Sequence, residues 1–450
     1  MRSPRPLAVL LAVLATVLVT GLAACSGPSA PAPVSEQTLR AIEADPGFTW
    51  ERQAAPLELG VTHTQDSLDS HHPDEATERG MQILRSGGAI WQNHHLMGFG
   101  TTNPEPSPGD YDWDSLDERM ELTEETGGKA MLTLCCAPDW MKGGEAGDTD
   151  WTLLEENPLP EHYGDFAKLA AEAVKRYPQV ERVMVWNELK GFYNQAANRW
   201  DYEGYTAFYN QVYRAVKDAR PDVQVGGPYV VLTSLDQGET DASDTVTGPW
   251  GAADQRALDV VDYWLQHNVG ADFLAVDAST ETRQDTIPSV LDGTQKYADL
   301  DRWLRQRSNL PIWWAEFYPD VPDGAEAGPD SPASATATLA SVAAYARSGA
   351  SGALLWGPQG DPELKYAALW TDATLDDGGR PTPLTAAWQW LVPRLAEGNV
   401  EIGRSADSPL LVFRASDGAV VVNPTDETVQ VTPDTEPVQG WAVTVIPGAT

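Results

Sequence analysis

Short apolar runs recur between residues 55 and 392, and each is followed by a polar loop and a segment with helical periodicity. Short runs that are apolar without strict alternation are typical of strands buried on both faces, as in a parallel sheet covered by helices. The runs lie at 57–62, 90–98, 130–136, 183–186, 223–227, 273–277, 312–315 and 352–356. The pattern therefore predicts eight buried strands.

The segments between these runs carry apolar residues at steps of three and four, which is the pattern of an amphipathic helix with one buried face. Tyr205, Tyr209, Val212 and Val216 form one such stripe. Strand and helix alternate eight times, and no glycine-rich phosphate-binding turn follows the first run. Both features favour a closed barrel over an open doubly wound sheet. We therefore predict an α/β fold, a (β/α)8 TIM barrel, over residues 51–393.

The pattern of apolar and polar residues changes after residue 393. Short apolar runs at 410–413 and 419–422 flank the turn Ser416-Asp417-Gly418, and further short runs follow at 429–431 and 441–445. This is the pattern of strands joined by hairpins. A segment of this length buries little core alone, so residues 394–450 are predicted to form a small all-β appendage packed on the barrel. The segment before Leu57 is a candidate to join it.

The first 24 residues have the features of an export signal: Arg2 and Arg5, an apolar run over 7–19, and small residues before Cys25. The ending Leu22-Ala23-Ala24-Cys25 resembles a bacterial lipoprotein box, which implies lipidation of Cys25. A plain secretory signal and an uncleaved anchor helix are the alternatives. Residues 25–50 begin with a Ser-, Pro- and Ala-rich tract and are predicted to form a flexible tether. The protein is expected on the outer face of the cell membrane, held only by its lipid, or secreted.

Charge narrows the range of partners. The chain has 66 acidic against 30 basic residues and a net charge of -36. A surface with this charge repels nucleic acids and other polyanions, so no nucleic-acid partner is expected and a neutral partner is favoured.

Cysteine and histidine usage gives no sign of a disulfide framework or a metal. Once Cys25 is assigned to lipid, only the adjacent Cys135 and Cys136 remain, and neighbours cannot join distant segments. His71-His72 and His94-His95 are isolated pairs without the spacing of a zinc site. No metal and no cofactor are therefore expected.

Two of the predicted strands end in glutamate. The fourth ends Trp186-Asn187-Glu188 and the seventh ends Trp314-Ala315-Glu316. Barrels of this kind carry their active sites at the C-terminal ends of the strands. Hydrolysis of a glycosidic bond with retention needs one carboxylic acid and one carboxylate about 5 to 5.5 Å apart. Glu188 and Glu316 are therefore predicted to be a catalytic pair.

These residues give the chain a resemblance to the clan A retaining glycoside hydrolases, and most closely to family 39, which contains β-xylosidases and α-L-iduronidases. Asn187-Glu188, Glu316 and Gly226-Gly227-Pro228 carry the resemblance. The resemblance implies that Glu188 is the general acid/base and Glu316 the nucleophile. It also implies that Asn187 holds the sugar 2-hydroxyl, that Trp356 forms the floor of the subsite, and that extra β strands lie beside the barrel.

Two positions differ from the usual pattern of this family. Asp277-Ala278-Ser279-Thr280 stands after strand six, where members usually show a His-x-Tyr sequence, so the aromatic hydroxyl expected near the nucleophile is missing there. Leu189 instead of proline follows Glu188.

Several other strand ends are candidate substrate contacts, because sugars are held by hydroxyl hydrogen bonds and by aromatic stacking on their apolar face. The candidates are His63, His95, Asp139, Trp140 and Tyr318. A histidine on a buried strand can equally be a satisfied core residue. The expected substrate is a plant or microbial oligo- or polysaccharide of neutral sugars, because a lone lysine on a loop, such as Lys142 or Lys190, is usually solvated.

Two other functional hypotheses are compatible with the same fold. A barrel that has lost catalysis could serve as a carbohydrate-binding surface lipoprotein, although both glutamates are intact. A metal-dependent hydrolase or an aldolase would need a histidine cluster at the strand ends or a lysine on strand six, and the run 273–277 contains no lysine. Covalent labelling of Glu316 by a substrate analogue is expected only for a retaining glycosidase and so distinguishes it from these two hypotheses.

Overall fold

A computed structural model describes residues 33–448 of the chain. The predicted signal sequence, Cys25 and the first part of the predicted tether lie outside these residues. Within the described residues, no helix has both the length and the apolar character needed to cross a bilayer.

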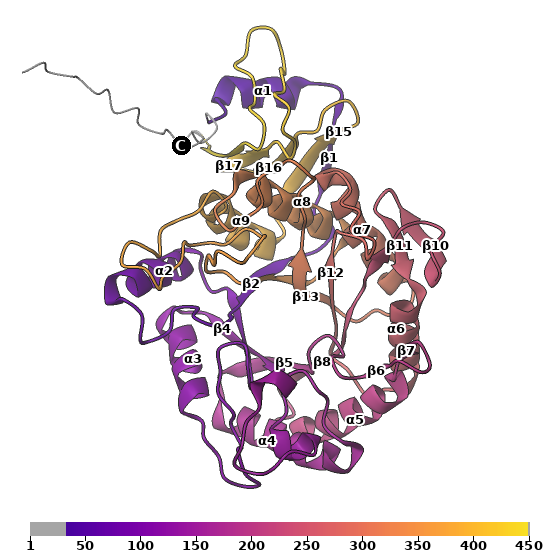
Figure 1. Ribbon diagram of the computed structural model, residues 1–450. Helices are drawn as coiled ribbons and strands as arrows, with labels where there is room; N and C mark the ends of the chain where they lie inside the picture. Colours follow the sequence, from indigo (N-terminus) through magenta and orange to yellow (C-terminus); the bar gives the residue numbers. More distant parts are fainter. Residues whose placement is uncertain (1–32, 449–450) are drawn as a thin grey trace, which may run out of the picture. The chain divides into compact units, whose positions relative to one another are not determined.

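A closed barrel of parallel strands forms the centre of the described chain (Figure 1). The barrel closes where β14 pairs with β2, from Gly352 opposite Glu58 to Trp356 opposite Thr62. Every barrel strand overlaps one of the predicted apolar runs, so the predicted TIM barrel is confirmed. The strands are β2 (Glu58–Thr62), β3 (Trp91–His95), β4 (Lys129–Leu134), β5 (Val180–Val185), β8 (Gln224–Val231), β12 (Phe273–Ser279), β13 (Ile312–Tyr318) and β14 (Gly352–Trp356).

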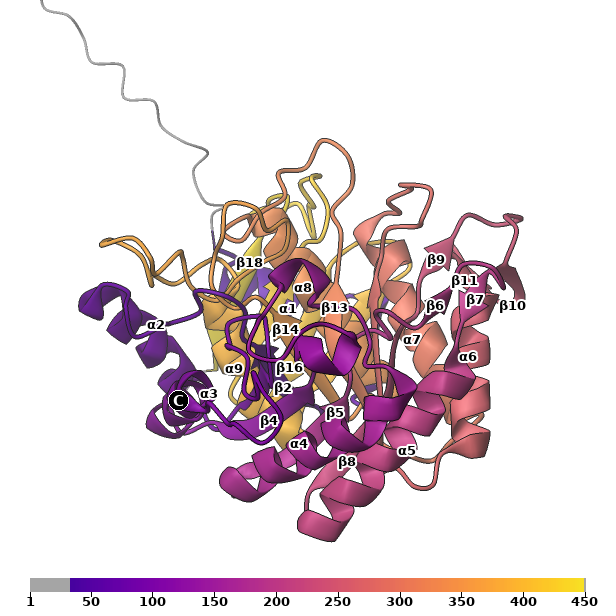
Figure 2. The same cartoon turned by 60° about the horizontal axis from the view of Figure 1, so that its bottom comes forward.

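Helices surround this ring of strands (Figures 1 and 2). In α5 the apolar stripe that the sequence shows is buried, and the side chain of Asp201 caps the first turn by accepting from the Gly204 amide at 3.0 Å. The helix α8 is capped at its C-terminal end by Gly349, whose φ of 85° a residue with a Cβ rarely adopts. The helices are α2 (Asp74–Ser86), α3 (Asp114–Glu125), α4 (Tyr163–Arg176), α5 (Tyr202–Ala219), α6 (Gln255–His267), α7 (Val290–Arg305), α8 (Pro332–Ser348) and α9 (Thr385–Glu397).

The loops between these elements carry short pieces of regular structure. They are the 3-10 turns Asp139–Lys142, Trp151–Leu153 and Pro160–His162, the hairpin β6 (Tyr193–Asn194) and β7 (Arg199–Trp200), and the small sheet β9 (Ser234–Leu235), β10 (Ala242–Gly248) and β11 (Gly251–Asp254).

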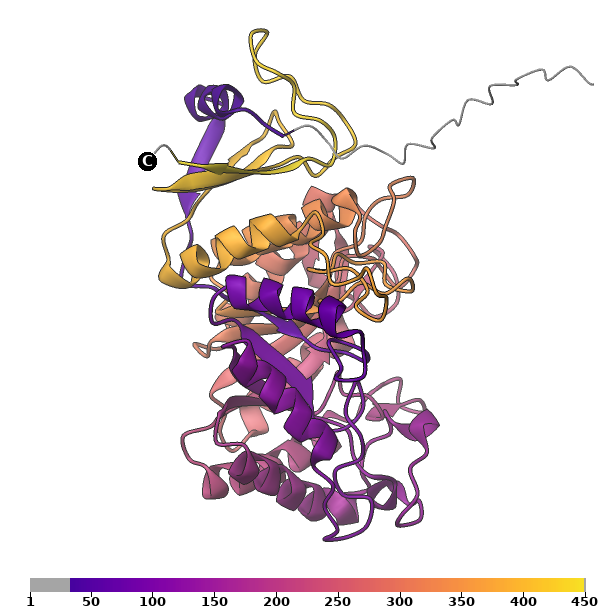
Figure 3. The same cartoon turned by 90° about the vertical axis from the view of Figure 1, so that its left-hand side faces the viewer.

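A five-stranded antiparallel sheet forms the appendage, in the order β1-β15-β16-β17-β18. One face, with Ile402, Phe413 and Val420, belongs to the main hydrophobic core, while the other, with Val412 and Val421, packs with α1 (Glu36–Ala44). Figure 3 shows the sheet between the indigo helix α1 and the orange helix α9. The predicted C-terminal β appendage is confirmed. Its strands are β1 (Phe48–Arg52), β15 (Glu401–Ser405), β16 (Leu411–Ala415), β17 (Gly418–Val422) and β18 (Val443–Pro447).

The range predicted as a tether, 25–50, therefore holds regular structure in its second half, because α1 and most of β1 fall within it. A strand at 48–52 is stable here only through its partner, since Phe48 pairs with Ser405 and Arg52 with Glu401. A partner some 350 residues away leaves no local pattern in the sequence.

The barrel interior is filled near the start of its strands. Lys129 Nζ lies 2.9 Å and Arg182 Nη1 3.2 Å from the Glu58 carboxylate, and the Arg182 guanidinium lies 4.1 Å from the Trp91 ring and 4.5 Å from the Trp313 ring. These residues lie at or near the first positions of their strands. These side chains occupy the N-terminal end of the barrel. In barrels of this kind the active site lies at the opposite, C-terminal end of the strands.

Candidate active site

Irregularities in strand pairing direct side chains into the C-terminal mouth of the barrel. Along β12 and β13, Val276 pairs with Trp314 and Asp277 with Glu316, so the register skips Ala315. Ala315 belongs to the inner cluster of the barrel, and the next side chain, Glu316, also points inward. A bulge thus turns two consecutive residues to the same side, which regular pleating does not allow.

Glu316 lies at the centre of this mouth, and its residue is 1% exposed. The hydroxyl of Tyr229 donates to its Oε1 and the hydroxyl of Tyr318 donates to its Oε2. Tyr229 reaches this position from a second skip of register, on β8, where its φ is 51°. The aromatic hydroxyl that strand six lacks is therefore supplied by β8 and β13.

Glu188 follows β5 in a turn of unusual backbone conformation. Trp186, Glu188 and Leu189 have φ values of 70°, 50° and 50°, which are uncommon for residues with a Cβ and are kept only where the surroundings fix them. The Trp186 indole supplies such a constraint, because its Nε1 donates to the Lys190 carbonyl at 2.8 Å. The Lys190 ammonium lies 3.0 Å from Glu188 Oε2 and also pairs with Glu155.

The structure brings three carboxyl groups together. One carboxylate oxygen from each of Glu188, Asp277 and Glu316 lies within 4.8 Å of the other two. Oxygens this close are compatible with the carboxyl separation of about 5 to 5.5 Å in retaining glycosidases, whereas inverting enzymes hold their carboxyl groups about 6.5 to 9.5 Å apart to leave room for water. Asp277 was not among the predicted site residues, although a charged residue ending a buried strand was the available signal.

Burial and mutual repulsion shape the titration of this cluster. Burial and the charge of Glu188 raise the pKa of Glu316 to about 8, while the two tyrosine hydroxyls oppose this shift. The same two causes raise the pKa of Asp277 well above its usual range. Neither Asp277 oxygen accepts a hydrogen bond from the described residues. We infer that Asp277 is protonated while Glu316 is ionised, because two donors stabilise ionised Glu316 and none stabilises ionised Asp277.

These shifts predict that alkaline pH destabilises the protein. Because the pKa of native Asp277 lies well above its ordinary value of 3.8, the native protein binds more protons than the unfolded chain does as the pH rises above that value, so stability falls. Asp277→Asn removes one of the groups responsible. It is expected to raise the Tm at pH 8 by about 2–4 °C and to change it little at pH 4.

The same variant tests the protonation of Asp277. Because Asn resembles a neutral Asp in shape, activity at neutral pH should stay within about ten-fold of wild type. Thermal unfolding and rates are compared with Asp244→Asn, which changes an exposed residue of β10. A Tm at pH 8 that does not rise in Asp277→Asn alone would contradict the inference.

Aromatic and polar side chains line the mouth next to the carboxyl cluster. The His95 ring lies 4.4 Å from Phe99 and 6.0 Å from Trp356, and Trp356 lies 6.5 Å from Tyr318. Burial lowers the pKa of His95 to about 3, so its imidazole is neutral. Neither ring nitrogen of His95 forms a hydrogen bond to any residue within 33–448, and Asn187 Oδ1 accepts none from these residues. Buried polar atoms of this kind are suited to sugar hydroxyls.

His63 has a different environment from the one predicted. Its Nδ1 lies 2.8 Å from Ser67 Oγ and its Nε2 lies 3.2 Å from Gln92 Oε1, and its ring stacks on His94. His94 in turn contacts Thr123 of α3 at 2.9 Å, so this group faces the helix layer. His63 thus matches the alternative of a satisfied core histidine.

Asp139 and Trp140 also find partners inside the protein. Asp139 accepts from the Asp150 amide and lies 3.3 Å from Lys142 Nζ. The Trp140 indole donates to the Glu105 carbonyl at 2.9 Å. These contacts hold the loop after β4. They engage the Trp140 indole and one Asp139 oxygen, while Asp139 Oδ1 is buried and accepts no hydrogen bond from the described residues.

The fold and the site define a parallel barrel with paired carboxyl groups at its C-terminal mouth. No protein-family model matches the chain, and no curated protein matches its sequence. Solved structures do match its fold. A monomeric β-xylosidase from Caulobacter crescentus CB15 aligns with a TM-score of 0.55 and 15% identity, over 86% of this chain and 77% of that one.

Two structures of family 39 align in the same way. One is a family 39 glycoside hydrolase from Bacteroides cellulosilyticus WH2, with a TM-score of 0.51 and 16% identity, over 85% of this chain and 74% of that one. The other is the GH39 enzyme from Xanthomonas axonopodis pv. citri, with a TM-score of 0.53 and 15% identity, over 84% and 74%. At these identities the likeness establishes the fold, which is that of the family that the sequence resembles.

Proposed function

We propose that this protein is a retaining glycoside hydrolase that cleaves O-glycosidic bonds by double displacement. The observation that carries the proposal is the separation of the Glu188 and Glu316 carboxylates, with oxygens within 4.8 Å at the mouth of the barrel. The structures that share its fold include enzymes named as β-xylosidases and β-glucosidases, which supports this reaction class.

In the first step, Glu316 attacks the anomeric carbon while Glu188 gives its proton to the leaving oxygen, so that the glycosidic bond breaks as the glycosyl-enzyme ester forms. Having given up its proton, Glu188 is a carboxylate and can act as a base. In the second step, Glu188 takes a proton from water as that water attacks the anomeric carbon, and the ester bond to Glu316 breaks and releases its carboxylate. The hydroxyls of Tyr229 and Tyr318 are placed to receive Glu316 again as a carboxylate.

Tyr318→Phe tests the role of these hydroxyls. Because the hydrogen bond from Tyr318 lowers the pKa of Glu316, its loss should leave less ionised nucleophile at neutral pH. We expect kcat/KM at pH 7 to fall about 10- to 100-fold, with a smaller loss at pH 9. A pH profile of an aryl glycoside with a good leaving group measures the shift. Loss of activity by the same factor at every pH would instead indicate a role in substrate contact alone.

We infer that the substrate is a plant or microbial oligo- or polysaccharide of neutral sugars. Lys190, the cation at the mouth, is paired with Glu188 and Glu155, and Lys142 is paired with Asp139. A substrate carboxylate would have to compete with these partners and with the negative field of the whole protein. A panel of aryl glycosides and oligosaccharides, with neutral and uronic sugars side by side, identifies the preferred class.

We further propose that the protein is a lipoprotein on the outer face of the membrane, on the basis of the Leu22-Ala23-Ala24-Cys25 sequence. Cys25→Ala is expected to move the protein from the membrane fraction to the soluble or secreted fraction. Wild-type protein found only in the soluble fraction would contradict the proposal.

A further inference from the structure

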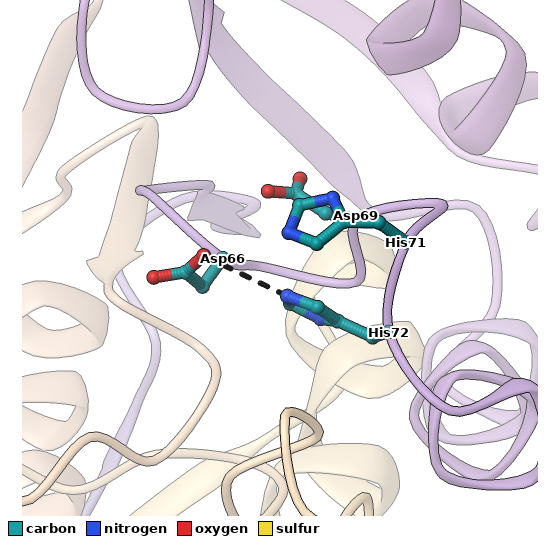
Figure 4. Close-up of side chains that lie close together, drawn as sticks. All are labelled: Asp66, Asp69, His71 and His72. Atoms are coloured by element: carbon teal, nitrogen blue, oxygen red, sulfur yellow. Dashed lines mark ion pairs between the residues drawn. The ribbon is translucent and has the colours of Figure 1, made fainter.

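The loop between β2 and α2 brings together four side chains with metal-binding atoms: Asp66, Asp69, His71 and His72 (Figure 4). One ligand atom from each lies within 4.8 Å of the other three. We propose that this loop binds a divalent transition-metal ion of the Zn²⁺ type. Two carboxylates and two imidazoles form a donor set that suits such an ion.

His72 supplies an independent observation that points to a ligand. Its side chain is only 4% exposed, and its Nδ1 makes no hydrogen bond to any residue of the described chain. Its Nε2 faces Asp66 Oδ1 (dashed line in Figure 4). The two atoms are 3.6 Å apart, a distance longer than a hydrogen bond. A buried imidazole nitrogen that lacks a partner is unfavourable. A metal ion between these side chains would satisfy one nitrogen with its lone pair.

The charges around the loop favour a cation despite one opposing group. Arg119 forms an ion pair with Asp69 and donates to the Ser67 carbonyl at 2.7 Å, so it fixes the loop but repels a metal ion. The cavity that contains Asp69 and His72 is otherwise strongly acidic. Its acidic lining consists of Asp69, Asp74, Glu78, Glu118, Glu121 and Glu125. The local charge is therefore negative, which concentrates cations.

The position of the loop gives the ion a structural role. Asp66 lines a second cavity together with Trp356, the residue that ends β14. The Asp66 carbonyl accepts from Gln359 Nε2 at 2.7 Å, and the Leu68 amide donates to Gln359 Oε1 at 3.2 Å. An ion bound here would stiffen the connection between the loops that follow β2 and β14. It takes no part in the carboxylate chemistry, so the site can exist whether or not the protein hydrolyses glycosides.

Metal binding is tested on tag-free protein that has been treated with EDTA and dialysed. We expect calorimetry with Zn²⁺ to show one ion per molecule with a Kd of about 1 μM or below, and the Tm to rise with Zn²⁺ concentration. Co²⁺ should give visible absorption bands of a His-ligated ion. If wild-type protein shows no stoichiometric binding of either ion at micromolar concentration, the proposal is wrong.

Variants locate the ion. His72→Gln and Asp66→Asn should each weaken Zn²⁺ binding by at least about 10- to 100-fold. Asp66 is exposed, so its replacement tests the site without disturbing the core. His267→Gln, at an exposed position on the last turn of α6, is the matched control and should bind as wild type does. Unchanged affinity in both loop variants, or an equal loss in His267→Gln, would place the metal elsewhere and overturn the assignment.

Discussion

Glu316→Gln is expected to lower the turnover of every glycoside substrate by at least about 10⁴-fold. The amide cannot form the glycosyl ester, and no other described carboxylate at the mouth receives two hydroxyl donors as Glu316 does. Because the nucleophile acts on all substrates, the loss should not depend on the leaving group. Steady-state rates on aryl glycosides with leaving groups of different pKa measure this directly.

A control and a chemical label make the Glu316 prediction specific. Glu239→Gln changes an exposed residue on a turn and should keep wild-type rates. A fluorinated sugar with a good leaving group should trap the glycosyl-enzyme, and peptide mapping should find the label on Glu316. Label on Asp277 would assign the nucleophile to strand six, and the absence of any label together with sugar binding would favour a carbohydrate-binding protein.

Glu188→Gln is expected to separate substrates by their leaving groups. A leaving group of low pKa departs without a proton, so the first step on an activated aryl glycoside should remain fast in this variant. An unactivated oligosaccharide needs protonation, and its turnover should fall about 10²- to 10⁴-fold. The second step should also slow, because Gln cannot activate water, so a burst of phenol release followed by a slow steady state is expected.

Azide distinguishes the loss of a base from the loss of structure. As a small anion that needs no general base, azide should accelerate the steady state of Glu188→Gln and give a glycosyl azide with retained anomeric configuration. Wild-type protein should not respond. Equal losses on activated and unactivated substrates, without rescue by azide, would show that Glu188 is not the acid/base.

Much of the barrel could be predicted from the sequence, because strands buried on both faces must be apolar throughout and the helices between them must carry one apolar stripe. The run 273–277 and the strand Phe273–Ser279 illustrate this agreement. The hairpin signals after residue 393 likewise predicted the appendage. The strand Phe48–Arg52 could not be placed, because its only stabilising partner, β15, comes far later in the chain.

The site could be predicted only where it follows from strand ends. Glu188 and Glu316 end apolar runs, so their meeting at one mouth follows from the barrel. The orientation of His63 could not be predicted, because alternate residues of a strand face opposite layers and the sequence alone does not say which layer each set faces. Tyr229 was missed for a related reason, since its role depends on a skipped position in strand pairing. Asp277 ends an apolar run as the two glutamates do, so a signal for it was present in the sequence.

The sequence by itself determined which segments become the barrel strands and the helices around them, and which residues stand at the C-terminal ends of those strands, because both follow from local hydrophobic period and chain order. The tertiary structure alone decided that Tyr229 and Tyr318 hold Glu316, that Asp277 joins the two glutamates, and that His71-His72 meet Asp66 and Asp69. These contacts join groups that the local period does not relate. Bulges in the strands and the conformations of loops bring these side chains together, and packing between distant segments determines where a bulge is tolerated.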